Sequence, residues 1–146
     1  MSLQEPEKKM SKSDENANAT IRLLDDRDSI IRKFKRAVTD SDSVVRYGED
    51  KPGISNLMDI YSCVTGRSYK EIEKEFDGKG YGDFKLAVGE AVADELAPLQ
   101  KRYEELMAEK TYLDSMIKAN DEKAQYYATK TLRKVQKKVG LTARIR

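Results

Sequence analysis

Residues 51–66, KPGISNLMDIYSCVTG, carry the clearest helical pattern in the chain. Proline is favoured at the first position of a helix and glycine just past its end, and Pro52 and Gly66 stand at these positions. Between them, apolar residues recur along one face: Ile54, Leu57, Met58 and Tyr61. The segment therefore predicts a helix with one buried face. Cys63 lies within it and is expected to be a small buried side chain rather than a nucleophile.

The segments on either side predict further helices. Asp26 is a candidate N-cap for a helix whose apolar residues again share one face: Ile30, Ile31, Phe34, Ala37 and Val38. Ser68 and Glu71 have the spacing of a capping box, which predicts another helix start. Residues 78–82, GKGYG, lack the GxxxxGK[ST] pattern of a phosphate loop, so a turn between helices is expected there.

The second half of the chain predicts long helices. One runs from Phe84 to about Glu109, and Pro98 is expected to kink it because proline removes a backbone hydrogen bond. Two more are expected at about 112–117 and 121–139. The apolar residues of the last helix are expected to pack in the common core: Ala124, Tyr127, Ala128, Thr131, Leu132, Val135 and Val139. We predict an all-α fold, a bundle of about five to six helices after an irregular N-terminal loop.

The composition excludes several classes of function. The 146 residues contain no histidine, which excludes Ser-His and Cys-His catalysis and the ordinary zinc sites, and no metal site is expected. A single cysteine excludes an internal disulfide and favours a reducing compartment. No apolar run approaches the roughly 20 residues needed to span a bilayer. We therefore expect a cytoplasmic protein without a membrane segment.

The C-terminal end is basic although the whole chain has a net charge of only +2. From Lys123 onward the sequence contains no acidic residue. Such a stretch is either a contact for a polyanion or a solvated helix face, and charge alone favours the second interpretation. The candidates for nucleic-acid contact are Arg133, Lys134, Lys137 and Lys138. Tyr126 and Tyr127 could stack on bases, although at least partial burial of one or both is the simpler expectation.

Residues 8–16, KKMSKSDEN, have the chemistry of a phosphate-binding loop. Lysine ammonium groups and serine hydroxyls on a flexible segment can neutralise the charge that develops on a leaving group. Ser13 or Asp14 is expected to cap the turn that follows. By composition alone, however, most segments rich in lysine and serine are solvated linkers.

The order of the residues is more specific than their composition. Residues 9–13, KMSKS, are identical to the second signature of class I aminoacyl-tRNA synthetases. The resemblance continues through SDENANATIRLLDD (13–26), KRAVTDSDSVVRY (35–47), KPGISNLMDIYSCVTG (51–66) and GKGYGDFK (78–85). Together these segments resemble the C-terminal portion of bacterial tryptophanyl-tRNA synthetases over nearly the whole chain. The final TARIR (142–146) has no place in the resemblance.

The resemblance implies a reaction and roles for the loop residues. In that family the loop closes over the triphosphate of ATP while the carboxylate of L-tryptophan attacks the α-phosphate. Pyrophosphate leaves with the assistance of Mg²⁺, and the aminoacyl group is then transferred to tRNA(Trp). Lys9 and Lys12 would be the catalytic, phosphate-contacting lysines. Ser11 and Ser13 would be secondary donors, and Met10 would set the conformation of the loop.

The resemblance also implies a division of the chain. Residues 1–20 would be a remnant of a Rossmann-type catalytic domain, with residues 1–3 as the end of one of its strands. Residues 21–146 would be the helical domain that contacts the anticodon region. The family's first signature contains histidine, which this chain lacks, so we expect a fragment that is inactive alone, taken from a homodimeric enzyme.

The sequence leaves three alternatives open. The first is the tyrosine-specific relative in the same class. The second is a non-enzymatic helical adaptor that uses the apolar spacing of residues 124–139 to pair with a partner helix. The third is a free-standing RNA-binding module whose affinity would fall steeply with salt.

Overall fold

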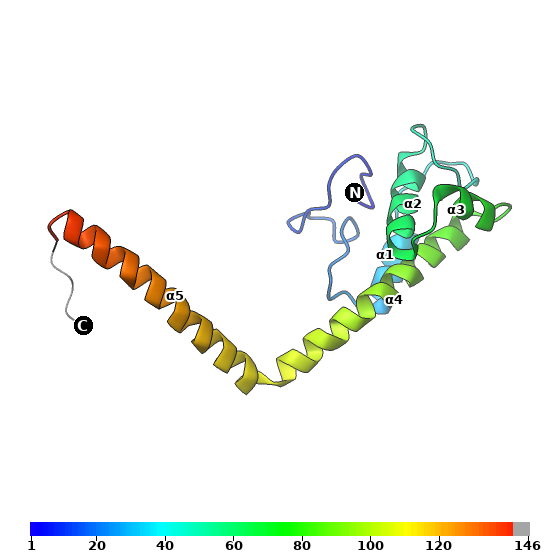
Figure 1. Cartoon of the computed structure of the whole chain (residues 1–146). Helices are drawn as coiled ribbons and strands as arrows, with labels where there is room; N and C mark the ends of the chain where they lie inside the picture. The colour runs from blue at the N-terminus through cyan, green and yellow to red at the C-terminus, as the bar shows by residue number, and fades with distance from the viewer. Residues whose placement is uncertain (142–146) are drawn as a thin grey trace. The chain divides into compact units, whose positions relative to one another are not determined.

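The computed structural model describes residues 1–141, in which all regular structure is helical. The helices are α1 (Arg27–Lys35), α2 (Pro52–Thr65), α3 (Tyr69–Glu75), α4 (Tyr81–Ala108) and α5 (Lys110–Lys138), as Figure 1 shows. The chain forms two compact units, Met1–Lys101 and the part from Arg102 onward. The prediction of an all-α fold with about five to six helices is confirmed for the described residues.

The helix ends follow the capping chemistry of the sequence. The Asp26 side chain accepts a hydrogen bond from the first turn of α1, and Pro52 is the first residue of α2. Gly66 ends α2 with a φ of 72°, a conformation that glycine adopts without steric cost. The Ser68 amide donates to Glu71 Oε2 at 2.8 Å and completes a capping box at α3. These predictions are confirmed.

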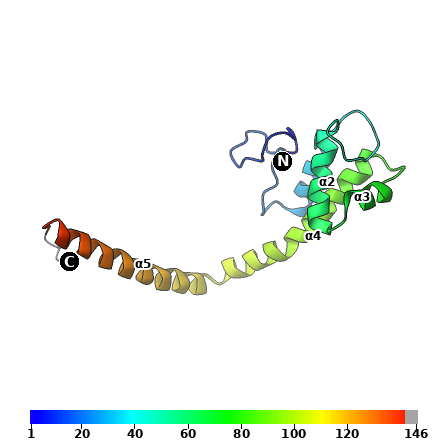
Figure 2. The same ribbon diagram turned by 45° about the horizontal axis from the view of Figure 1, so that its top comes forward.

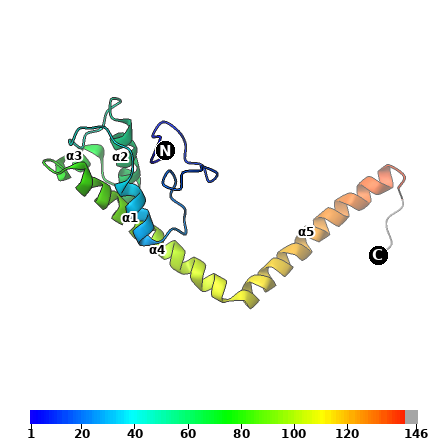
Figure 3. The same ribbon diagram turned by 180° about the vertical axis from the view of Figure 1, so that it is seen from behind.

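The hydrophobic core of the first unit lies between α1, α2, α3 and the N-terminal part of α4. Phe84 packs edge to face with Phe76 and Tyr61, at centroid distances of 4.9 Å and 5.9 Å. Helices α2 and α3 contact each other (Figure 2). Helix α1 lies alongside α4 (Figure 3), where a Cβ on Gly89 would be 3.0 Å from the Cα of Ile31. The other fully buried side chains of this core are Leu3, Ile30, Phe34, Ile54, Leu57, Met58, Ile72 and Val88.

The second unit departs from the prediction in two ways. Residues 110–138 form one continuous helix instead of two, because no proline or glycine interrupts them. Helix α5 also buries none of its residues, so the expected packing of 124–139 in the common core is wrong. Tyr126 and Tyr127 are exposed rather than partly buried. The core of the first unit is filled by residues that precede α5.

Cys63 is exposed, and the prediction of its burial is wrong. It follows Tyr61 by two positions, which places it about 200° around α2 from that buried side chain.

Pro98 lies inside α4, which is one helix from Tyr81 to Ala108, so the expected kink stays a prediction. Among the described residues, no helix combines the length and hydrophobicity that crossing a bilayer requires.

Candidate functional site

The loop of residues 9–18, here called the signature loop, is held at both ends by two consecutive backbone amides. The Ser2 amide donates to the Lys8 carbonyl at 2.7 Å, and the Leu3 amide donates to the Ala19 carbonyl at 3.0 Å. Ser2 and Leu3 are both buried. The two ends of the loop are therefore fixed close together.

The Ser2–Leu3 pair is in turn attached to the helical part of the first unit. Asn56 of α2 is buried, and its Nδ2 donates to the Ser2 carbonyl at 3.1 Å. The Val38 amide, just after α1, donates to the Leu3 carbonyl at 2.8 Å. Sequence analysis did not single out these contacts, because they join residues far apart in the chain.

Within the loop, polar side chains bind the backbone of their neighbours. The hydroxyls of Ser11 and Ser13 lie 2.9 Å apart, and the Ser13 amide donates to Ser11 Oγ at 3.3 Å. Asp14 Oδ1 accepts from the Asn16 amide at 2.8 Å, which confirms the expected cap of the following turn. Beyond the loop, the Thr20 hydroxyl donates to the Ser11 carbonyl at 3.1 Å.

The two predicted phosphate-binding lysines have exposed side chains. In residues 1–141, no ion pair or hydrogen bond engages the ammonium group of Lys9 or Lys12. Lys8, by contrast, pairs with Glu5, and the hydrogen bond with that carboxylate raises the Lys8 pKa. Met10 is partly buried and packs against the core. The loop thus combines an inward-facing methionine with two lysines that are available to an anion.

The predicted nucleic-acid residues lie in the second unit. Arg133, Lys134, Lys137 and Lys138 are all exposed on α5. On the same helix, the Lys130 ammonium lies 5.7 Å from the centroid of the Tyr126 ring. These residues form a basic surface with exposed aromatic rings, a combination that suits nucleic acid.

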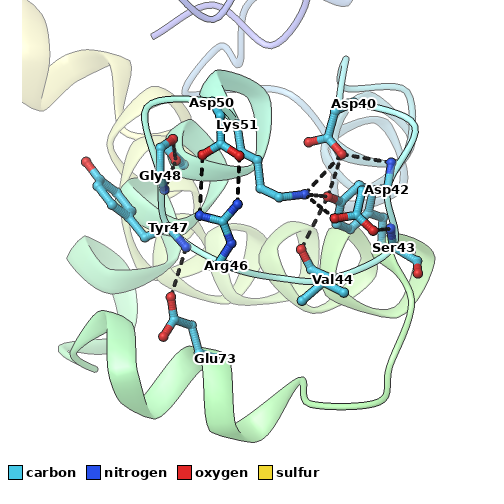
Figure 4. Close-up of polar contacts among 12 residues, drawn as sticks. Asp40, Asp42, Ser43, Val44, Arg46, Tyr47, Gly48, Asp50, Lys51 and Glu73 are labelled. Carbon is cyan, nitrogen blue, oxygen red and sulfur yellow. Dashed lines mark hydrogen bonds and ion pairs between the residues drawn. The ribbon is translucent and has the colours of Figure 1, made fainter.

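A buried lysine forms a further polar cluster that sequence analysis missed (Figure 4). Lys51 is 4% exposed, and its Nζ donates to Asp42 Oδ2 at 2.7 Å and to Asp40 Oδ1 at 3.2 Å. It also donates to the Tyr81 hydroxyl at 2.8 Å, and that hydroxyl donates to Asp40 at 2.7 Å. The available signal was a pair of acids shortly before a lysine at a helix start.

The cluster shifts the ionisation of its members. The hydrogen bond with Asp42 is the largest of the effects that raise the Lys51 pKa. The same hydrogen bond lowers the Asp42 pKa. Burial by itself would raise the pKa of Asp40, but hydrogen bonds from Tyr81, the Asp42 amide and Lys51 lower it overall. These contacts fix the irregular segment between α1 and α2 against the start of α4.

Comparison with known proteins gives consistent matches. The family described as tRNA synthetases class I (W and Y) matches residues 1–97. The tryptophan–tRNA ligase of Clostridium acetobutylicum is 49% identical over 140 residues, which is 96% of this chain. That of Oceanobacillus iheyensis is 50% identical over 142 residues, or 97% of the chain.

A solved structure extends the match to three dimensions. The crystal structure of tryptophanyl-tRNA synthetase from Mycoplasma pneumoniae aligns with 98% of this chain at a TM-score of 0.72 and 29% identity. The chain spans 42% and 43% of the two relatives named above, and 45% of the Mycoplasma chain. The similarity therefore covers nearly all of this chain and less than half of each relative.

Proposed function

Because the chain belongs to the class I tRNA synthetases of the tryptophan and tyrosine group, we propose that it supplies the ATP-phosphate loop of a tryptophan–tRNA ligase. In the proposed reaction, ATP and L-tryptophan form tryptophanyl-adenylate and pyrophosphate, and the tryptophanyl group is then transferred to tRNA(Trp). The preference for tryptophan over tyrosine rests on the relatives, which are named tryptophan–tRNA ligases at 47–50% identity.

The observation that carries the proposal is the state of the two lysines. Lys9 and Lys12 are exposed on a loop whose ends are fixed, and no acidic side chain among residues 1–141 pairs with them. A preorganised cation stabilises a developing negative charge without reorganising at the moment of reaction. In our proposal, these ammonium groups contact the phosphates that leave as pyrophosphate. Ser11 and Ser13 would donate from the same loop, and Met10 would hold it inward.

Mg²⁺ is assigned to the nucleotide in this proposal. Among the described residues, no group of three or more acidic or cysteine side chains is placed to hold a metal ion. The ammonium groups of the signature loop cannot serve as ligands for Mg²⁺, which is bound by oxygen atoms of carboxylates, phosphates and water. Among residues 1–141, therefore, no set of side chains fits a resident magnesium site.

The remaining parts of the proposal concern partners. We propose that residues 1–20 complete a catalytic domain, that residues 21–146 face tRNA(Trp), and that the whole ligase is a cytoplasmic homodimer. Arg133, Lys134, Lys137 and Lys138 are the candidate contacts with RNA phosphates. Their exposure and the lack of acidic residues from Lys123 onward support this choice.

A chimeric enzyme tests the proposed activity. Residues 1–146 would replace the matching segment of the Clostridium acetobutylicum ligase, and tryptophan-dependent exchange of pyrophosphate into ATP would be measured. We expect the chimera to be active and the isolated 146-residue chain to be inactive. A well-folded chimera without exchange activity would contradict the proposal.

The tRNA contact has its own test. Binding of tRNA(Trp) to the chimera should weaken with salt, and Lys134→Ala should reduce the slope of log K against log salt by about one. Lys70→Ala, on the exposed face of α3, is the matched control. If both variants have the unaltered slope, Lys134 does not contact an RNA phosphate.

A further inference from the structure

One hydrogen bond reaches the middle of the signature loop from outside it. The Thr20 hydroxyl donates to the Ser11 carbonyl at 3.1 Å. The same carbonyl accepts the Asp14 amide at 3.2 Å, which closes a turn within the loop. Ser11 stands between Lys9 and Lys12, so its backbone position affects both lysines.

Thr20 is itself fixed to the helical part of the first unit. Its carbonyl accepts a hydrogen bond from Lys33 Nζ at 2.9 Å. Lys33 belongs to α1, its side chain is 9% exposed, and its ammonium group also pairs with Asp25. The buried ammonium group of Lys33 therefore holds the Thr20 backbone, and this fixes the position from which the Thr20 hydroxyl donates.

The other contacts of the loop do not replace this bond. The Ser2 and Leu3 amides hold the carbonyls of Lys8 and Ala19, just outside the two ends, and the Ala19 amide donates to the Asn16 carbonyl near the second end at 2.9 Å. Met10 contacts the core through an unbranched apolar side chain, which can adopt many rotamers. Among the described residues, the hydrogen bond from Thr20 to the Ser11 carbonyl connects the middle of the loop to α1, because Lys33 of α1 binds the Thr20 carbonyl.

We propose that Thr20 is a positioning residue for Lys9 and Lys12. This inference rests on the proposed function, because it assigns to Thr20 the task of placing the phosphate-contacting ammonium groups. Thr20 acts through the Ser11 backbone and does not touch the substrate. A displacement of about 1 Å at a reacting centre can lower a rate by about 100-fold. A loosened loop is therefore expected to reduce the rate of adenylate formation more than the binding of tryptophan.

The matched variants are Thr20→Val and Thr20→Ser. Valine keeps the branched shape of threonine but has no hydroxyl, and serine keeps the hydroxyl. Neither change removes the Thr20 carbonyl that binds Lys33, so the fold should be retained. In the 146-residue chain, ¹⁵N relaxation would give order parameters for residues 10–14. We expect ordered values of about 0.8 in the natural chain and in Thr20→Ser, and values below about 0.6 in Thr20→Val.

The amides of α2 and α4 serve as the internal control and should be unaffected by either change. In the chimeric ligase, Thr20→Val should lower kcat for pyrophosphate exchange by about tenfold or more, with the KM for tryptophan unaltered. Thr20→Ser should restore kcat. This split and the rescue by serine separate positioning from a general loss of stability.

The relaxation and exchange measurements together distinguish a failure of this inference from a failure of the proposed function. If Thr20→Val leaves the order parameters of residues 10–14 unaltered, the inference is overturned whatever the chimera does. A mobile loop in Thr20→Val together with an unaltered kcat also overturns it. The third outcome is a chimera that is inactive even with Thr20 in place, while relaxation shows that the loop loosens in Thr20→Val and is ordered in Thr20→Ser. This outcome supports the positioning of the loop by Thr20 and contradicts the proposed function.

Discussion

Gly53 of α2 lies directly against the backbone carbonyl of Val38: a Cβ on Gly53 would stand 2.3 Å from that oxygen. It would also be 3.0 Å from the Cα of Thr39. Both neighbours are backbone atoms and cannot rotate away. The Val38 amide in turn binds the Leu3 carbonyl, so the same close approach supports the segment that holds the signature loop.

Gly53→Ala is therefore expected to destabilise the first unit. Overpacking costs about 1–3 kcal/mol and occasionally more. Gly82→Ala is the control, because nothing lies within 4 Å of its Cβ position in α4, and alanine favours the helix by up to about 1 kcal/mol. Urea unfolding followed by far-UV circular dichroism measures both. Equal midpoints for the two variants would contradict the close approach.

Phe84→Ala is expected to cost about 3–5 kcal/mol of unfolding free energy, because it removes a fully buried ring packed against Tyr61 and Phe76. Tyr126→Ala, at a 61% exposed position of α5, should change stability by no more than about 0.5 kcal/mol. The same urea experiment compares them. A cost at Tyr126 as large as that at Phe84 would place α5 in a packed core after all.

The Lys51 cluster predicts that the folded chain loses stability as the pH falls into the acid range. The folded-state pKa values of Asp40 and Asp42 lie below their ordinary values, so the unfolded chain binds more protons in acid. Their contribution is present above about pH 4 and is lost as the pH falls through the folded-state values. The raised pKa of Lys51 contributes stability that is complete below about pH 10 and disappears only at higher pH.

Lys51→Met should lower the thermal midpoint at neutral pH, because it leaves the two carboxylates without their cation. The gap between the variant and the natural chain should narrow as the pH falls from about 5 to about 2, where the carboxylates become protonated in both. Lys70→Met controls for the loss of a surface charge. A gap that stays constant over this range would argue that the ion pairs do not contribute.

Lys9→Ala and Lys12→Ala are each expected to lower the exchange rate of the chimeric ligase by about 10²–10³-fold, or roughly 2.7–4 kcal/mol of barrier, by analogy with other preorganised donors. Lys70→Ala should leave the rate unaltered. Because the Lys9 and Lys12 ammonium groups have no ion pair among the described residues, neither substitution should alter stability much. Full activity in both variants would remove them from the catalytic machinery.

Local signals explain what could be predicted from the sequence. Helices α1 to α3 follow from caps and apolar spacing within a few residues, whereas the phosphate-binding role of residues 9–13 is an expectation drawn from the order of the residues. The Lys51–Tyr81 and Thr20–Lys33 hydrogen bonds join separate elements and leave no periodic pattern. The sequence predicts two helices where α5 is continuous, because the polar residues in the middle of α5 resemble a turn although they include no helix breaker. The roles of Lys9 and Lys12 stay predictions.

The hydrogen bonds from two adjacent amides, those of Ser2 and Leu3, close the signature loop without a covalent bond. The entropy of closing a ring grows only slowly with its length, at about 0.6 kcal/mol for each doubling. A longer or shorter loop would therefore change the free energy of unfolding little, whereas the proposed positioning of Lys9 and Lys12 depends on the hydrogen bond between Thr20 and Ser11. An insertion or deletion at Ser2 or Leu3 would cost more, because shifting either residue by one position would break the hydrogen bond that holds one end of the loop.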